Sequence, residues 1–112
     1  MSETEEEETL ESQICDLTEQ IEQSNKAADL FYKRSVLYLK LSNKDDCLSD
    51  LDKCIELNPK SDLYQYKKGK VFYENGYDNL DTLQYFLETV KLNPTHFKAH
   101  NRIGIIYTAL RF

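Results

Sequence analysis

The sequence has few residues that break helices. Its 112 residues include only three glycines and two prolines, and no tryptophan. So few turn-forming residues cannot supply the many tight turns of a β-sandwich or barrel, which favours an all-α fold. No apolar run approaches the roughly 18 residues that a membrane span needs, and the start, MSETE, lacks the basic and apolar segments of a signal peptide. We therefore expect one small domain in the cytoplasm or the nucleus.

The cysteines and histidines do not form a recognisable metal or redox motif. Cys15, Cys47 and Cys54 are an odd number at no metal-ligand spacing. On one helix Cys47 and Cys54 would share a face but stand roughly 10 Å apart, too far for a disulfide. We expect all three to be small buried side chains in a reducing compartment. His96 and His100 are four residues apart but have no third ligand, so we interpret them as packing residues and expect no metal or cofactor.

The negative charge is concentrated at the start of the chain. The formal net charge is −6, and six of the twenty acidic residues lie within residues 1–11. The other fourteen acidic residues balance the fourteen lysines and arginines. We therefore predict an acidic, disordered tail over residues 1–11 and a neutral body after it.

A short phrase recurs in the body. Residues 54–59 read CIELNP and residues 89–94 read TVKLNP, and these phrases contain both prolines. Before each phrase lie two apolar-periodic segments separated by polar turn residues. Because proline cannot extend a helix and disfavours helical geometry in the residue before it, each phrase should end a helical hairpin. The predicted hairpins are residues 28–59 and 62–94. The predicted caps of their second helices are Asp45 or Asp46 and Asp78 or Asn79.

The repeated unit resembles the tetratricopeptide repeat, a helix-turn-helix unit of about 34 residues. The resemblance covers residues 12–112, and Arg34 departs from it because leucine is usual there. It implies an all-α fold, a right-handed α-solenoid of antiparallel helix hairpins with about six helices. The residues that carry it are Phe31, Ser35, Tyr38, Cys47, Leu51, Cys54 and Pro59 in the first unit, Gly69, Phe72, Gly76, Thr82, Phe86, Thr89 and Pro94 in the second, and His100, Ile103, Gly104 and Tyr107 in a third first helix, 97–112.

Residues 12–25 have the apolar pattern of a second helix without its mate. Ile14, Leu17 and Ile21 fall on the apolar positions of such a helix, and Gln13 and Gln20 replace its small residues. We predict a lone helix that caps the front of the stack. A coiled-coil strand is the alternative, because Leu10 and the three apolar residues also fit a heptad over fewer than two full repeats.

The resemblance implies a peptide-binding groove lined by the first helix of each repeat. Aligning these helices places one basic residue at the same position of each: Lys33, Lys67 and Arg102. A basic, aromatic-lined groove favours an acidic or carboxylate-ended peptide. The predicted peptide-binding residues are Tyr32, Lys33, Val36, Tyr66, Lys67, Lys70, Lys98, Asn101 and Arg102. The alternative is that these lysines only solvate exposed helix faces.

The function that the resemblance implies is a protein–protein interaction module. Some family members hold the carboxylates of chaperone C-termini in a clamp, and Lys98 and Arg102 match its third-repeat pair. Tyr32, Val36 and Lys67 depart from the rest of the clamp, so a chaperone ligand is not assigned. We expect a protein or peptide partner of co-chaperone-like chemistry, and no enzymatic activity, small-molecule substrate or membrane. Single-stranded RNA is a less favoured ligand because the chain is acidic.

A third first helix without its mate predicts an exposed apolar face. This face would make the chain an architectural subunit that assembles with another chain or with itself, which is the alternative function. The predicted assembly residues are Ile103, Ile106, Tyr107, Leu110 and Phe112.

Overall fold

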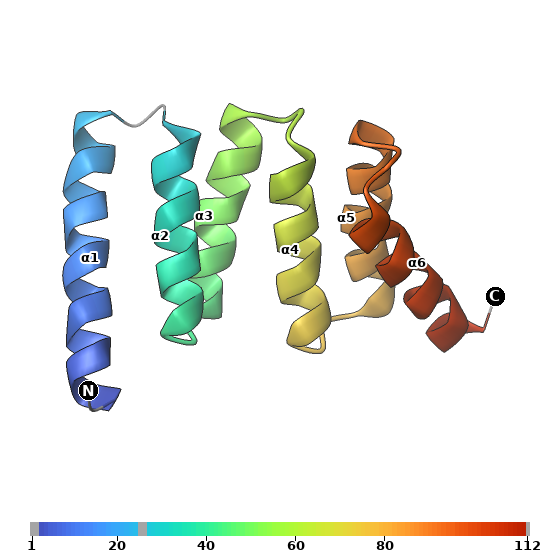
Figure 1. Cartoon of the computed structure of the whole chain (residues 1–112), viewed down its shortest axis with the longest axis horizontal. Coiled ribbons are helices and arrows are strands. Elements are labelled where there is room, and N and C mark those ends of the chain that lie inside the picture. The colour runs from blue at the N-terminus through green and yellow to red at the C-terminus, as the bar shows by residue number, and fades with distance from the viewer. Residues whose placement is uncertain (1–2, 25–26, 112) are drawn as a thin grey trace. The chain divides into compact units, whose positions relative to one another are not determined.

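The computed structural model describes residues 3–24 and 27–111, and these residues form six α-helices without a strand. The helices are α1 (Glu3–Gln23), α2 (Ala28–Lys40), α3 (Lys44–Leu57), α4 (Asp62–Glu74), α5 (Asn79–Leu92) and α6 (Phe97–Leu110). Within the segments 1–59 and 60–112, successive helices run in opposite directions (Figure 1). The prediction of an all-α fold with about six helices in antiparallel hairpins is confirmed.

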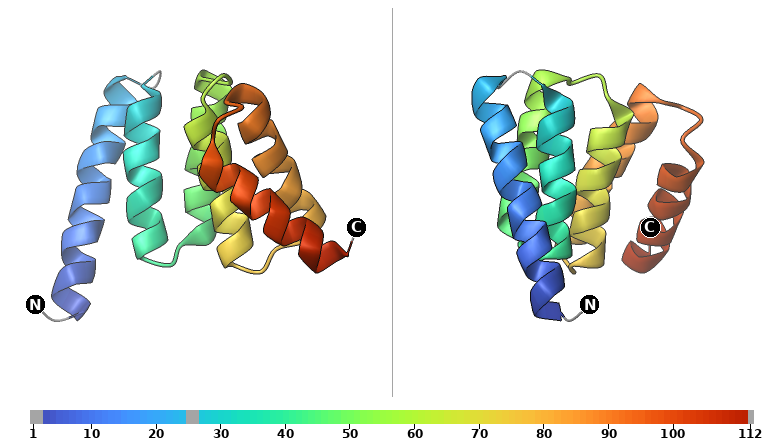
Figure 2. Two further views of the ribbon diagram at one scale, coloured as in Figure 1. Left: turned by 45° about the vertical axis from the view of Figure 1, so that its right-hand side comes forward. Right: turned by 60° about the vertical axis from the view of Figure 1, so that its left-hand side comes forward.

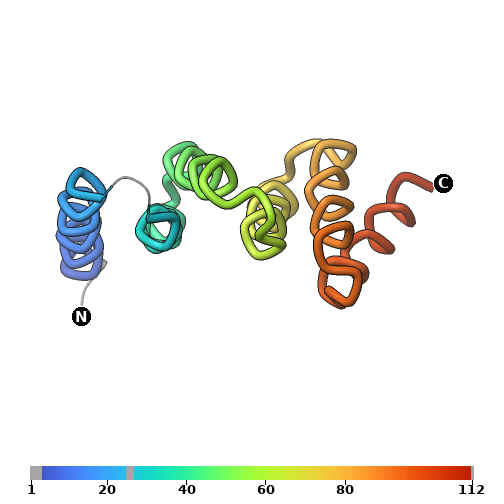
Figure 3. Tube along the Cα trace, turned by 90° about the horizontal axis from the view of Figure 1, so that it is seen from above, coloured from blue at the N-terminus to red at the C-terminus, as the bar shows by residue number. Residues whose placement is uncertain are grey.

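The helices fall into two compact units, Met1–Pro59 and Lys60–Phe112. In the first unit α2 packs against both α1 and α3, and in the second α5 packs against both α4 and α6. Figure 2 shows α6, in red, inclined across α5, and Figure 3 shows the same inclination from above. Among the described residues, no helix combines the length and apolarity that crossing a membrane requires.

The second helix of each hairpin begins at a polar turn, as predicted. Asp78 caps α5, and its carboxylate accepts hydrogen bonds from the backbone amides of Leu80 (2.8 Å) and Asp81 (3.4 Å). At α3 the predicted cap is wrong, because the helix begins at Lys44 and its N-cap is Asn43. Asp45 and Asp46 lie in the first helical turn, where a negative charge still interacts favourably with the helix dipole.

Two residues of the second phrase, Asn93 and Pro94, mark the end of the second hairpin. Asn93 ends α5, and its side-chain amide donates a 2.9 Å hydrogen bond to Asp62 at the start of α4. The backbone amide and hydroxyl of Thr95 donate to the side-chain oxygen of Asn93. Asn93 thus joins the two ends of the second hairpin, and Pro94 follows where the helix stops.

The core of the first unit contains an ion pair. Arg34 donates hydrogen bonds from Nε and Nη2 to the two carboxylate oxygens of Asp50, at 2.8 and 2.7 Å. Its Nη1 also donates to the hydroxyl of Thr18, 3.2 Å away. Asp50 is almost fully buried beside Leu51 and Cys54 on α3. Arg34, the departure from the repeat pattern, therefore links α1, α2 and α3.

The core of the second unit is a cluster of Tyr66, Leu83, Phe86, Ala99 and Ile106. α4 and α5 approach closely at Gly69, because a Cβ on Gly69 would lie only 2.9 Å from Cε1 of Phe86 and 3.1 Å from Cβ of Tyr85. A larger residue at this position would have to displace an aromatic ring that has no solvent exposure.

The prediction of a disordered tail over residues 1–11 is wrong for the residues that the structure describes. α1 begins at Glu3, so residues 3–11 are helical, and residues 1–2 lie outside the described residues. Glutamate is a good helix former, and acidic side chains near a helix N-terminus interact favourably with the macrodipole. The sequence interpretation gave too much weight to the charge of the segment and too little to its helix propensity.

Two of the three cysteines are buried, as predicted, and one is not. Cys47 and Cys54 have 2% and 0% exposure, whereas Cys15 is exposed on α1. Burial, with a smaller effect from the charge of Asp50, raises the pKa of Cys47 from 9.0 to about 11 and that of Cys54 to about 12. All three are free thiols.

We expect a thiol reagent at neutral pH to label one cysteine of the native protein and three of the unfolded protein. Thiolates are the reactive species, and burial with a raised pKa keeps Cys47 and Cys54 protonated and shielded. Mass spectrometry after brief labelling measures this. A Cys15→Ser variant should show almost no native labelling, and rapid labelling of that variant would contradict the structure.

Candidate functional site: a basic groove between α4 and α6

A groove of about 420 Å³ lies between α4 and α6 in the second unit. Its lining residues are Tyr66, Lys70, Lys98, Asn101, Arg102 and Ile105. The first five belong to the predicted peptide-binding set, and Ile105 was not predicted. Tyr66 and Lys70 come from successive turns of α4, and the other residues come from α6. The two helices therefore bring together residues that the repeat alignment had placed in adjacent repeats.

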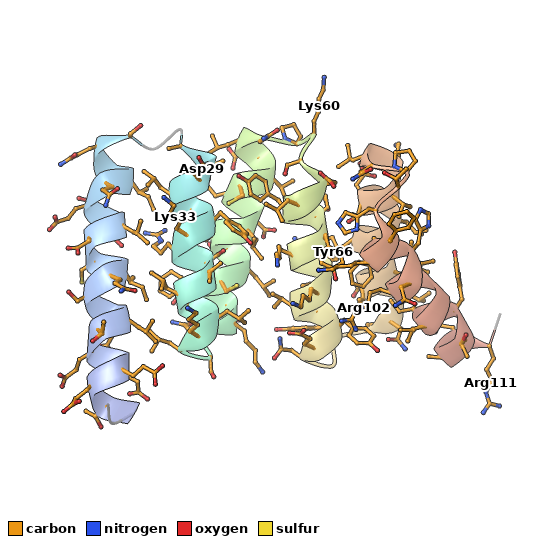
Figure 4. All side chains as sticks on the ribbon, viewed as in Figure 1. Asp29, Lys33, Lys60, Tyr66, Arg102 and Arg111 are labelled. Carbon is orange, nitrogen blue, oxygen red and sulfur yellow. The ribbon has the colours of Figure 1, made fainter. Side chains whose placement is uncertain are left out.

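Aromatic rings form the base of the groove. Tyr66 is buried, and its ring centroid lies 4.7 Å from that of His96 and 5.6 Å from that of Phe86. The guanidinium carbon of Arg102 lies 4.7 Å from the centroid of the Tyr73 ring. Figure 4 shows Tyr66 and Arg102 close together where α4 faces α6. The rings hold the Arg102 guanidinium against α4, and a guanidinium held in this way is preorganised for a carboxylate.

The groove is electropositive. Lys67, on α4 beside the groove, has a pKa below its ordinary value, first because of burial and then because of repulsion from Lys70 and Lys98. Glu74 opposes this shift, and its carboxylate lies 3.9 Å from the ammonium group of Lys70. Among the described charged groups that act on Lys67, one carboxylate thus opposes two ammonium groups. An anion bound here would replace repulsion with attraction.

The two units differ in charge. Residues 60–112 contain eight lysines and arginines against five acidic residues, a net +3, whereas residues 1–59 contain six against fifteen, a net −9. The predicted neutral body is therefore neutral only as a sum. The unit that contains the groove is the positively charged one. It should therefore attract anionic ligands over a long range.

The other predicted peptide-binding residues lie in the first unit. Tyr32, Lys33 and Val36 line a groove of about 440 Å³ between α1 and α2. The remaining lining residues of this groove are Gln13, Asp16, Leu17 and Leu37. Most of the groove surface is apolar, and its lining includes one basic residue, Lys33, and one acidic residue, Asp16. Each unit thus has its own groove, and the basic column from Lys33 through Lys67 to Arg102 remains a prediction because it joins residues of both units.

The predicted assembly face is only partly exposed. Ile106 is fully buried in the core of the second unit, and Ile103 and Leu110 pack against the same cluster. Their predicted exposure was wrong because α5 covers this side of α6. Tyr107 is 37% exposed, and Phe112 lies outside the described residues. The large apolar residues that α6 exposes are Phe97, Ile105 and Tyr107.

The two histidines form hydrogen bonds at the start of α6. Nδ1 of His96 accepts a 3.2 Å hydrogen bond from the amide of Ala99 and so caps α6. His100 is exposed, and its Nε2 lies 2.7 Å from the carbonyl oxygen of Pro94. Among the residues with a described placement, no three histidine, cysteine or acidic side chains are grouped as a metal site would need.

No protein-family model matches the sequence, and no curated protein matches it. The fold, however, matches solved structures. The first TPR of Spaghetti (RPAP3), solved with the HSP90 peptide SRMEEVD, aligns with a TM-score of 0.80 at 18% identity, over 96% of this chain and 84% of that one. The second TPR domain of human RPAP3, solved with the HSP70 peptide SGPTIEEVD, aligns with a TM-score of 0.73 at 22% identity, over 83% and 77%. The chain has the tetratricopeptide-repeat fold.

Two structures of MamA align with this tetratricopeptide-repeat chain at similar levels. The TM-scores are 0.79 and 0.77, each at 21% identity, over 86% and 85% of this chain. The chain spans about half the length of these MamA structures, 56% and 51%. At such identities the likeness establishes the fold, and the ligand must be argued from the residues of the groove.

Sequence reasoning missed Tyr73 and Ile105, although a signal for Tyr73 was present. Tyr66, Lys70 and Tyr73 follow the i, i+4, i+7 pattern of one helix face, so Tyr73 could have been placed on the groove side. Ile105 lies one turn after Asn101 on α6. The sequence interpretation included Val36 of the first repeat but did not extend it to Ile105, the equivalent residue 69 positions later.

Proposed function

We propose that this chain is a protein-interaction module that binds an acidic peptide or helix of a partner protein in the groove between α4 and α6. The observation that carries this proposal is the convergence of Lys70, Lys98 and Arg102 around Tyr66, with Lys67 beside them. We propose binding rather than catalysis, because these residues offer cations and an aromatic surface but no nucleophile with an adjacent base.

The lowered pKa of Lys67 gives the proposal a physical basis. Burial and the neighbouring ammonium groups of Lys70 and Lys98 make the charged form of Lys67 less favourable than in water. A carboxylate in the groove would form charge-assisted hydrogen bonds with these groups and raise the pKa of Lys67. The repulsion among Lys67, Lys70 and Lys98 in the free protein should therefore strengthen the binding of a carboxylate, because the carboxylate relieves it.

The structural neighbours support an acidic peptide as the ligand class. The peptides named with the RPAP3 domains, SRMEEVD and SGPTIEEVD, both end in Glu-Glu-Val-Asp. Lys98 and Arg102 occupy the pair of positions that match a carboxylate clamp, whereas Tyr32, Val36 and Lys67 differ from it. We therefore propose acidic peptides as a class, with Lys98 and Arg102 as the anchor, and assign no particular chaperone.

We expect the double variant Lys67→Glu, Arg102→Glu to bind SRMEEVD at least about tenfold more weakly than the wild type, since each reversal replaces attraction with repulsion. The matched control is Lys60→Glu, Lys91→Glu. It changes the net charge equally at two exposed lysines that do not line the groove. Calorimetry or fluorescence anisotropy at several salt concentrations measures the affinities.

Three further arms test the class of ligand. A peptide with glutamine in place of glutamate should bind weakly, and so should a peptide with an amidated C-terminus. Single-stranded RNA in the same salt series separates peptide binding from a general affinity for polyanions. An equal loss in both double variants, or RNA binding stronger than peptide binding, would reject the proposed groove.

A further inference from the structure

In the second unit, α4 occupies a seat formed by α5 and α6. Gly69 of α4 fits against Phe86 and Tyr85 of α5. On its other side α4 contacts α6 through the Tyr73 ring beneath Arg102 and the Tyr66 ring beside His96. The first helix of a repeat is thus held by its own second helix and by the first helix of the next repeat.

The first unit contains an equivalent seat between α1 and α2. Its groove residues each lie 69 positions, one repeat of 34 plus one of 35, before a residue at the α4 seat. The pairs on the second helices are Gln13 with Thr82, Asp16 with Tyr85 and Leu17 with Phe86. The pairs on the first helices are Tyr32 with Asn101, Lys33 with Arg102, Val36 with Ile105 and Leu37 with Ile106. No helix of the described part of the first unit lies in this groove, and Val36 is 36% exposed there.

The outer face of α6 has the register of a helix that fits such a seat. His100, Asn101, Gly104, Ile105 and Thr108 line a depression on this face. Each lies 35 positions after a residue of α4, namely Gln65, Tyr66, Gly69, Lys70 and Tyr73. A Cβ on Gly104 would meet no atom within 4 Å among the described residues, apart from the nearby backbone of α6 itself, and Ile105 is 42% exposed. The face that α4 buries is therefore uncovered on α6.

The two helices that would meet, α1 and α6, are opposite in net charge. α1 contains nine acidic residues and no basic one, whereas α6 contains Lys98 and Arg102 and no acidic one. Both surfaces also replace apolar residues of the repeat with polar ones. Gln13 and Gln20 of α1 stand at small-residue positions, and His100 of α6 stands at an aromatic one. Lys33 is the basic residue within the groove, and Asp16 lines the same groove.

We propose that α6 of one copy of this chain docks into the α1–α2 groove of a second copy, as α4 docks between α5 and α6. Gly104 would lie against Leu17 of the second copy, and Ile105 and Thr108 would face its α2. This contact joins two different surfaces, so it does not close into a two-fold dimer and instead adds copies head to tail, in an open chain or a closed ring. The proposal does not depend on peptide binding, because the docking face is centred on Gly104 and shares only Asn101 and Ile105 with the groove between α4 and α6.

Sedimentation velocity and light scattering over a concentration series test the proposal with the full chain. We expect the mean mass of the wild type to rise with concentration beyond that of a dimer. Gly104→Gln fills the docking face, where the free chain has open space, and Val36→Arg places a cation in the groove that receives a basic helix. Each variant should weaken association about tenfold or more.

Matched controls and a mixing experiment make the result decisive. Ala109→Gln is an exposed change on α6 outside the depression, and Leu39→Arg is a change on α2 with the same 36% exposure as Val36 but outside the groove. Both controls should associate like the wild type. A mixture of Gly104→Gln and Val36→Arg copies should form one-to-one dimers and stop there, because each copy retains one intact surface.

Three results would overturn the proposal. The first is a wild-type chain that stays monomeric at every concentration. The second is association that both site variants leave unchanged, and the third is a dimer that the mixture of variants fails to restore, which would indicate a two-fold contact through one surface. Circular dichroism of each variant verifies that the helices remain folded. Peptide binding by a strictly monomeric wild type would reject the assembly and leave the proposed function standing.

Discussion

Replacing Asp50 with alanine is expected to destabilise the protein by about 3 kcal/mol, because it leaves the Arg34 guanidinium shielded from water without its charged partner. The side chains of Arg34 and Asp50 are 16% and 5% exposed, and two hydrogen bonds join them. Phe31 and Tyr38 flank the guanidinium at 5.7 and 5.6 Å from their ring centroids, which leaves little room for water to replace the lost carboxylate. Chemical denaturation monitored by circular dichroism measures the change.

A second variant separates the loss of the pair from the loss of either charge. Replacing Arg34 and Asp50 together with leucine should recover most of the stability, because an apolar pair of similar volume needs no compensation for burial. Leucine is also the residue that the repeat pattern favours at position 34. The matched single control is Asp45→Ala, an exposed carboxylate in the first turn of α3, which should cost less than about 1 kcal/mol through the helix dipole. An Asp50→Ala cost no larger than that of Asp45→Ala would show that the pair contributes as little as a surface ion pair.

The Arg34–Asp50 pair is a contact between helices that the sequence alone did not predict. Apolar spacing and the two Asn-Pro phrases located the hairpins, since both are local signals that each helix carries alone. Arg34 was recognised as a departure, but its partner lies sixteen residues away on the facing helix. Which of the acidic residues of α3 meets it depends on how the two helices pack, and Asp45, Asp46 and Asp52 were equal candidates in the sequence.

The sequence predicted the residues that line the groove between α4 and α6 more accurately than the exposure of the apolar residues on α6. Tyr66, Lys70, Lys98, Asn101 and Arg102 meet in the structure because repeat alignment converts sequence position into position on adjacent helices. The exposure predicted for Ile106 was wrong because it rested on the pattern of a single helix. Periodicity shows that a helix has an apolar face but does not show which neighbour covers it, and α5 rather than a following helix covers Ile106. The charge division between the units was hidden because totals over the whole body cancel.

Gly69→Ala is expected to destabilise the protein by about 1–2 kcal/mol, whereas Gly104→Ala should stabilise it by roughly 0.5–1 kcal/mol. The two glycines occupy the same position in successive first helices, 35 residues apart. In a helix interior alanine is favoured over glycine by up to about 1 kcal/mol, and this gain applies to both. At Gly69 it is outweighed, since the new methyl group would lie 2.9 and 3.0 Å from two carbons of the buried Phe86 ring. At Gly104 no such contact exists among the described residues.

Thermal and urea unfolding at low protein concentration measure both variants on the folded single chain. Adding Phe86→Leu to Gly69→Ala should cost less than the two changes do separately, because the smaller side chain makes room for the methyl group. A stabilising Gly69→Ala would show that α4 and α5 can move apart at little cost, and the close fit described for the second hairpin would be wrong. A destabilising Gly104→Ala would show that the outer face of α6 is already covered in the single chain, and that a second copy has no open face on which to dock. The sign of the change in unfolding free energy at each of these two equivalent glycines thus reports whether another helix packs closely against that face of the first helix.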